Sequence, residues 1–152
     1  TASMAPIILV LNGPNLNLLG TREPATYGHE TLADISALCG QAGEELGLKV
    51  EFRQTNHEGE LLDWIHKARG RCAGILINPA AFTFTSLALL DALKMFKGPI
   101  IEFHISNVHR REQIYHKSLV SMTATAVMAG LGATGYPHAV RALKLLVAEG
   151  KR

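Results

Sequence analysis

The chain alternates short apolar runs with longer segments in which apolar residues recur every three or four positions. The first run, 7–11, is continuously apolar, which is typical of a parallel strand buried on both faces. Apolar and polar residues alternate over 48–54, which predicts a second strand nearer the edge of a sheet. Three further strands are predicted at 74–78, 99–103 and 124–128.

Helical periods separate these strands. The first predicted helix runs from the N-cap Thr31 to a stop at Gly47. Three more are predicted at 58–69, 86–96 and 137–148. Strands that alternate with helices favour a parallel sheet, because each crossover places its helix on one face. We therefore expect one α/β domain over the whole chain, with a five-stranded parallel sheet and helices on both faces.

Composition narrows the function classes. The chain has 152 residues, of which 47% are hydrophobic and 18% charged, and its formal net charge is +2. These values argue against disorder and against a nucleic-acid partner.

No apolar run approaches the ~20 residues that span a bilayer, so no membrane partner is expected. Cys39 and Cys72 lack a C-x-x-C spacing, which indicates reduced thiols and favours a cytoplasmic protein. The opening Thr1–Met4 is interpreted as a cloning remnant.

Polar residues cluster where three predicted strands end, at 12–17, 78–86 and 104–111. In open parallel sheets, ligands bind beyond the carboxyl ends of the strands. We expect these three segments to converge on one site.

Glu102 and His104 occupy alternate positions of the fourth predicted strand, so they point to the same side. A carboxylate bonded to one imidazole nitrogen fixes the tautomer and prepares a general acid, although a structural Glu–His pair fits the spacing equally well. Backbone N–H groups of Ile105 and Ser106, together with Asn78, are suited to binding a carboxylate.

The segment 20–28 is polar and has glycine at each end. It is either an ordinary surface loop or a lid that carries Arg22 and Tyr27 over a pocket. A tyrosine serves as a general base when neighbouring arginine charge and exclusion of water favour its ionised form.

Other motifs argue against cofactor chemistry. The segment 130–135 matches G-x-G-x-x-G, but too little chain follows it for a dinucleotide-binding unit, so a tight turn with close helix packing is favoured. The histidines form no H-E-x-x-H or His/Cys cluster, and no lysine lies within an apolar run. We predict neither a metal nor any other cofactor.

Several separate motifs resemble those of the type II 3-dehydroquinate dehydratases, and the similarity extends from Ile7 to Leu146. The motifs are Asn12–Gly20, Arg22–Gly28, Asn56–Glu60, Asn78–Pro79 and Glu102–Asn107. The resemblance implies a flavodoxin-like fold and a homododecamer built as a tetramer of trimers. It also implies cofactor-free trans dehydration of a cyclic carboxylic acid, 3-dehydroquinate, to 3-dehydroshikimate, in a biosynthetic or a catabolic pathway.

The resemblance assigns roles in acid–base chemistry. Tyr27 would be the base that removes the C2 proton, with Arg22 and Arg111 favouring its ionised form. His104, oriented by Glu102, would give its proton to the departing C1 hydroxyl.

The same resemblance implies how substrate is held. Asn15 would hold a water that stabilises the enolate, and Asp91 would reach the site of a neighbouring subunit. The carboxylate would be bound by Asn78, Ile105 and Ser106.

Two binding positions depart from the family pattern. Phe84 stands where a histidine is expected, and Tyr115 where an arginine is expected, and both of those residues would contact ring hydroxyls. Leu90 also replaces a usual arginine. The substrate is therefore either 3-dehydroquinate or a related cyclic hydroxy-keto acid acted on by a dehydratase paralogue. A non-catalytic carboxylate-binding homologue is the third possibility, and the retained acid–base residues argue against it.

Overall fold

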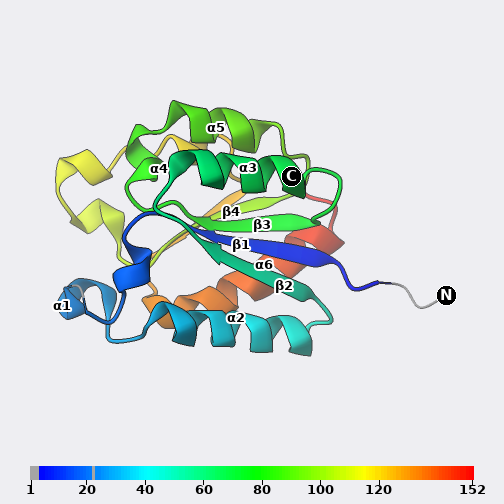
Figure 1. Ribbon diagram of the computed structural model, residues 1–152, viewed down its shortest axis with the longest axis horizontal. Helices are drawn as coiled ribbons and strands as arrows, with labels where there is room; N and C mark the ends of the chain where they lie inside the picture. Colours follow the sequence, from blue (N-terminus) through cyan, green and yellow to red (C-terminus); the bar gives the residue numbers. More distant parts are fainter. Residues whose placement is uncertain (1–3, 22) are drawn as a thin grey trace.

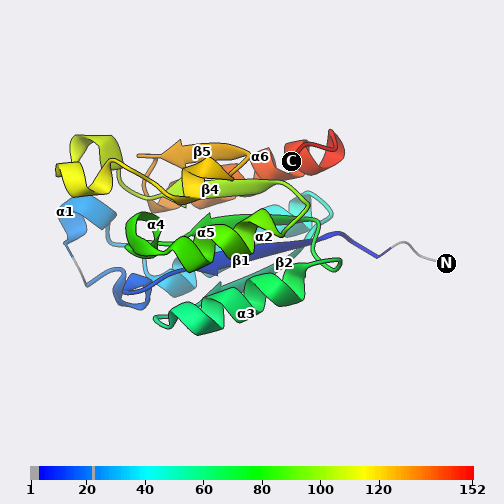
Figure 2. The same cartoon turned by 90° about the horizontal axis from the view of Figure 1, so that it is seen from above.

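The computed structural model describes residues 4–21 and 23–152. Its centre is a five-stranded, entirely parallel sheet in the order β2-β1-β3-β4-β5 (Figure 2). The strands are β1 (Ile7–Asn12), β2 (Lys49–Gln54), β3 (Gly74–Asn78), β4 (Ile100–His104) and β5 (Ala126–Ala129). The predicted α/β fold is confirmed, and β2 lies at a sheet edge as its alternating pattern predicts.

Helices cover both faces of the sheet. Figure 1 shows α2 (Leu32–Glu45) and α6 (Tyr136–Ala148) on one side, and α3 (Glu58–Ala68) and α5 (Leu87–Lys94) on the other. Shorter helical turns lie in the connections: α1 (Pro24–Tyr27), α4 (Phe82–Thr85), η1 (Leu16–Leu18), η2 (Val108–Arg110), η3 (Gln113–Tyr115), η4 (Val120–Met122) and η5 (Ala133–Gly135). In Figure 1, α1 and α4 both lie at the end of the sheet away from the chain's N-terminus.

The pleat of β1 divides the core into two clusters. Ile8 and Val10 pack with α2 and α6, whereas Leu9 and Leu11 pack with α3 and α5. All four side chains are buried, because this strand lies inside the sheet and is covered on both faces. A continuous apolar run is therefore the pattern that its position requires.

Two predicted helix starts show how local chemistry sets the boundaries. The Thr31 hydroxyl accepts from the Asp34 N–H, and the Asp34 carboxylate accepts from the Thr31 N–H, which forms a capping box before α2. The helix predicted at 86–96 begins at Leu87, with the Ser86 hydroxyl accepting from the Leu89 N–H, and ends at Lys94. The sequence predicts a turn at 83–86 leading into this helix, and the structure has there the separate helical turn α4.

The glycine-rich segment 130–135 forms the tight turn that its sequence predicts. Gly130 and Gly132 have φ angles of 93° and 77°, in the left-handed region. A Cβ atom on Gly135 would lie 2.6 Å from the Leu131 Cβ and 3.2 Å from the Phe103 ring. Glycine at this position therefore lets α6 begin close to β4.

Of the two cysteines, Cys39 is buried and Cys72 is half-buried. Burial raises the pKa of the Cys39 thiol to about 12 and also raises that of Cys72. In the part of the chain that the structure describes, helices long and apolar enough to cross a membrane are absent.

Candidate active site

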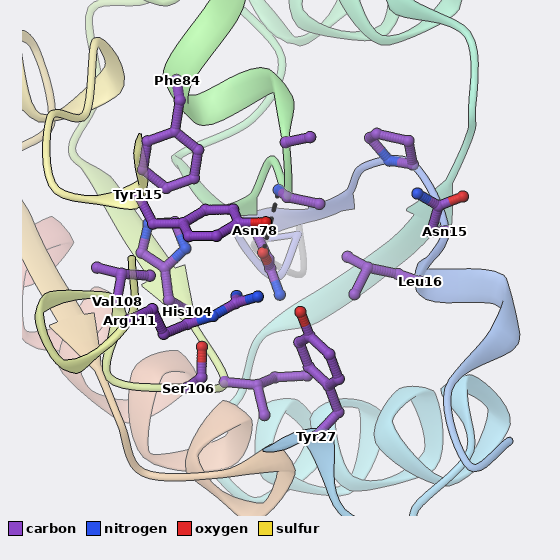
Figure 3. Close-up of a pocket in the computed structure, with 14 residues that line it drawn as sticks. Asn15, Leu16, Tyr27, Asn78, Phe84, His104, Ser106, Val108, Arg111 and Tyr115 are labelled. Atoms are coloured by element: carbon purple, nitrogen blue, oxygen red, sulfur yellow. Dashed lines mark hydrogen bonds between the residues drawn. The ribbon is translucent and has the colours of Figure 1, made fainter. Parts of the chain in front are cut away.

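A cavity lies beyond the carboxyl ends of β1, β3 and β4, where the three polar segments converge as predicted (Figure 3). Nine of the predicted site residues line it: Asn15, Tyr27, Asn78, Phe84, His104, Ile105, Ser106, Arg111 and Tyr115. Glu102 contacts His104 from behind the cavity wall, and Asp91 is exposed on α5. Arg22 lies outside the described residues.

The ends of β1 and β3 approach so closely that only glycine fits between them. A Cβ atom on Gly13 would lie 2.2 Å from the carbonyl oxygen of Pro79. The Gly13 N–H instead donates to the Asn78 carbonyl at 2.8 Å. The chain then turns through Asn15, whose φ of 70° is left-handed and whose N–H donates to the Asn56 side chain at 2.9 Å. The turn thereby places Asn15 on the cavity rim.

A buried tyrosine fixes the side chain of Asn78. The Tyr136 hydroxyl donates to the Asn12 side-chain oxygen at 2.7 Å and accepts from the Asn78 Nδ2 at 2.9 Å. The Asn78 Oδ1 accepts from the Ala80 N–H at 3.2 Å. Burial raises the pKa of the fully buried Tyr136 hydroxyl, so it remains a proton donor. These bonds set which way the Asn78 amide faces at the cavity.

Glu102 and His104 point to the same side of β4 and are hydrogen-bonded, with His104 Nε2 and Glu102 Oε2 2.6 Å apart. The Glu102 Oε1 accepts from the hydroxyls of Ser121 at 2.6 Å and Ser118 at 3.0 Å. Burial acts to raise the Glu102 pKa, but these hydrogen bonds and the His104 charge outweigh it and lower the pKa below its usual value. Glu102 is thus a buried carboxylate that stays ionised and orients His104.

Aromatic rings form the wall above His104. The Phe84 ring stacks against the His104 ring with centroids 6.1 Å apart and planes 23° apart. Tyr115 meets Phe84 edge-to-face at 5.5 Å. The Arg111 guanidinium carbon lies 4.1 Å from the centre of the Tyr115 ring, a cation–π geometry that fixes its position. This part of the wall presents apolar surface and one cation.

Tyr27 enters the cavity from the opposite side. It is the last residue of α1, and Gly28 follows it with a φ of 85°. Figure 3 shows the Tyr27 hydroxyl directed into the cavity and towards Arg111, on the side away from Phe84. The Arg111 guanidinium carbon lies 5.6 Å from the Tyr27 ring centre, so its positive charge lies beside the phenol ring. The segment 20–28 therefore delivers Tyr27 to the cavity on a helical turn.

Metal ligands do not gather anywhere in the described residues: no three His, Cys, Asp or Glu side chains are grouped so as to hold an ion. The polar side chains that line the cavity are instead two tyrosines, an imidazole, amides, a hydroxyl and a guanidinium. Such groups transfer protons and bind oxygen atoms.

Three residues of the site were missed by sequence reasoning: Ser118, Ser121 and Tyr136. The serines lie 16 and 19 positions after Glu102, and Tyr136 lies 58 after Asn78. No local spacing connects them to their partners. The one available signal is that Tyr136 directly follows the tight turn at 130–135, and that turn brings α6 against the sheet.

Comparison with known proteins identifies the family. A family model described as Dehydroquinase class II matches residues 6–144. The chain is 60% identical over 146 residues to the 3-dehydroquinate dehydratase 2 of Pseudomonas putida, covering 96% of this chain and 98% of the relative. It is 61% identical over 144 residues to the protein of the same name from Ralstonia nicotianae, covering 91% and 94%.

Solved structures agree with this similarity. The type II dehydroquinase from Propionibacterium acnes superimposes with a TM-score of 0.90 at 46% identity, covering 95% of this chain and 99% of that one. A 3-dehydroquinate dehydratase-like protein from Bifidobacterium longum gives 0.71 at 34% identity, covering 94% and 98%. The flavodoxin-like parallel sheet and the motifs at its strand ends thus have one explanation: the chain belongs to the class II dehydroquinase family of hydro-lyases.

Proposed function

We propose that this protein catalyses the cofactor-free trans dehydration of 3-dehydroquinate to 3-dehydroshikimate through an enolate. The observation that carries the proposal is that the Tyr27 hydroxyl and the His104 ring line one cavity from two different elements. A base and an acid on separate walls are what the removal of a proton and a hydroxyl from opposite faces of a ring requires. The names of the relatives support the choice of substrate.

The reaction proceeds in two proton transfers. The Tyr27 phenolate takes the C2 proton, and the electrons of that C–H bond pass to the C3 carbonyl to give an enolate. The enolate then re-forms the ketone, the C1–C2 double bond forms, and the C1–O bond breaks. His104 gives its proton to the departing hydroxyl, which leaves as water. Tyr27 has gained one proton and His104 has lost one, and exchange with solvent restores both.

Arginine charge is the means by which Tyr27 becomes a base. Arg111, held by the Tyr115 ring, presents its guanidinium towards the Tyr27 hydroxyl (Figure 3). We assign Arg22 to the same task on the resemblance to the family. A water bound by Asn15 stabilises the enolate oxygen in this scheme.

The substrate carboxylate is assigned to the end of β4. Ile105 and Ser106 directly follow His104 and line the cavity, so their N–H groups and the Ser106 hydroxyl are donors at the site. Asn78 has a second amide proton beyond the one donated to Tyr136, and it completes the anion site.

A second candidate substrate follows from Phe84. Its ring stacks on His104 and meets Tyr115 edge-to-face, so the Phe84 side chain itself offers a substrate hydroxyl no hydrogen-bonding partner. A dehydratase paralogue would then prefer a cyclic hydroxy-keto acid with fewer hydroxyl groups on that side.

The proposed assembly is a homododecamer, a tetramer of trimers, in which Asp91 contributes to a neighbouring site. The exposure of Asp91 on α5, outside the cavity of its own chain, supports this assignment. Sedimentation equilibrium should give a mass about twelve times the 16.4 kDa of one chain. A monomer or dimer that is fully active would contradict it.

One experiment separates the functions. Dehydration conjugates the ketone with the new double bond, so an enone absorbance grows when enzyme and substrate are mixed. Growth with 3-dehydroquinate supports the first candidate, and growth only with a less hydroxylated analogue supports the second. Ligand-dependent stabilisation without any absorbance change would instead indicate a non-catalytic carboxylate-binding protein.

A further inference from the structure

Glu102 has hydrogen-bonding partners on both carboxylate oxygens. The residue is 1% exposed, and one oxygen faces the His104 ring while the other accepts from two serine hydroxyls. A buried carboxylate without such donors would take up a proton to avoid the cost of an unsolvated charge. The serines therefore bear directly on the charge of the group that orients His104.

The segment that carries the two serines is anchored so that its hydroxyls face Glu102. The Ser118 oxygen accepts from the Ser121 N–H at 3.0 Å, which leaves the Ser118 hydroxyl proton directed at Glu102. The Leu119 N–H donates to the Thr83 carbonyl at 2.9 Å, and Val120 is fully buried in the core. The backbone thus holds both serines in place without help from the substrate.

We propose that Ser118 and Ser121 are positioning residues that keep Glu102 ionised and so keep the transferable proton on His104. The inference rests on the proposed function, in which His104 protonates the departing hydroxyl. Neither serine lines the cavity, so both act through Glu102.

The acidity of His104 depends on whether the proton between its Nε2 and the Glu102 Oε2 resides on the ring or on the carboxylate. With both serines donating, the favoured state is an imidazolium beside a carboxylate. Without them, the proton on His104 Nε2 moves to Glu102 Oε2, which leaves a neutral ring beside a neutral acid. The N–H of a neutral imidazole is a far weaker acid than an imidazolium, so protonation of the leaving hydroxyl slows. Substrate binding is unaffected by this transfer.

Among the described residues that surround Glu102, His104 is the ionisable side chain that is hydrogen-bonded to it. The adjacent strands β3 and β5 carry no ionisable side chains. Asp91 and Lys94 on α5, and Lys117 beside the serines, are exposed to solvent. A change in Glu102 ionisation on serine substitution is therefore attributable to the lost hydroxyls.

The test combines kinetics with a direct titration of Glu102. We expect Ser121→Ala and Ser118→Ala each to lower kcat about tenfold, and the double change about 100-fold, with KM unchanged. In substrate-free protein, the infrared carboxyl band that disappears in Glu102→Gln reports protonation of Glu102. Its midpoint should move to higher pH in the serine variants.

Matched variants make the outcome decisive. Ser121 is exposed, so Ser121→Thr has room for its methyl group and, because it keeps the hydroxyl, should leave both kcat and the midpoint at the values of the unmodified protein. Ser36→Ala on α2, on the other side of the sheet, should change neither. If Ser118→Ala does not fold, the exposed Ser121 carries the test alone.

An unmoved midpoint, or a raised KM with unchanged kcat, would overturn the inference. The infrared titration needs no turnover, so it decides the role of the serines even if 3-dehydroquinate proves not to be the substrate.

Discussion

Phe84 and Tyr115 present aromatic surface at two positions where the resemblance to the family implies side chains that would bond substrate hydroxyls. A lost polar contact costs ~0.5–1.5 kcal/mol, or up to ~3 kcal/mol if charged, and an unpartnered buried hydroxyl costs ~1–3 kcal/mol more. We therefore expect kcat/KM for 3-dehydroquinate to be roughly 10²–10⁴-fold below that of an ordinary family member. The Tyr115 hydroxyl reduces this loss where it can bond substrate.

The double change Phe84→His with Tyr115→Arg should raise kcat/KM for 3-dehydroquinate. Steady-state rates of both proteins under the same conditions measure the effect. The specificity argument is wrong if kcat/KM of the unmodified protein already equals that of its relatives, or if the double change does not raise it. In that case the site binds 3-dehydroquinate well with Phe84 and Tyr115 in place.

Tyr27 allows a test of the proposed base. Tyr27→Phe removes one hydroxyl from a half-buried side chain at the end of α1, so the fold should persist. Loss of a general base typically costs 10²–10⁴-fold in rate, and we expect turnover to fall by at least that much. Circular dichroism controls for folding, and a variant that keeps a near-normal rate would remove Tyr27 from the mechanism.

At the scale of elements, the strands were predictable because burial on two faces leaves an uninterrupted apolar run, as in β1 and β3. Helix α2 was predictable because Thr31 and Asp34 make its cap within one turn. The start of α5 was predictable to within one residue, but the helical form of the turn before it, α4, was not, because four residues are too few for an apolar spacing to record. The glycines at 20 and 28 indicated the limits of the segment that carries Tyr27, but nothing in the pattern predicted the helical turn α1 within it.

The residues of the site also fall into those that were predictable from the sequence and those that were not. Glu102 and His104 were predictable together because strand alternation alone puts them on one side. The contacts of Ser118, Ser121 and Tyr136 depend on which distant elements meet, and no single-segment pattern contains that information. The stacking of Phe84 on His104 likewise depends on the close approach of α4 to the end of β4.

The junction of η5 with α6 tests the close packing at the glycine-rich turn. Gly135→Ala would force a methyl group against Leu131 and Phe103, and overpacking of this kind costs typically 1–3 kcal/mol. Gly135 has a φ of -70°, which any residue adopts, so Gly135→Ala tests the steric clash alone. Gly59→Ala, inside α3 with open space around it, should be neutral or stabilising by about 0.5–1 kcal/mol. Urea unfolding of both variants measures the difference, and equal midpoints would contradict this account of the turn.

For the whole molecule, Glu102 links stability to pH. Its pKa is lowered in the folded state, so its contribution is fully present above the unfolded value of ~4.3 and is lost as pH falls through the folded value. The free energy of unfolding should therefore decline below about pH 4.3, and Glu102→Gln should make that decline shallower. Denaturant unfolding between pH 7 and pH 3 measures both slopes. Parallel slopes would show that the Glu102 charge is not stabilised by the fold.

The segment from η3 to η4, residues 113–122, limits how this enzyme can be re-engineered or diverge. Tyr115, which lines the cavity, lies on the same short stretch of backbone as Ser118 and Ser121, which donate to Glu102. A change of length there would alter substrate preference and proton delivery at once. Phe84 lies on α4, whose Thr83 carbonyl accepts from the Leu119 N–H, so a change confined to the Phe84 side chain can explore new substrates while that backbone hydrogen bond keeps the serines in place. Adaptation of this protein to new ring chemistry should therefore begin on α4.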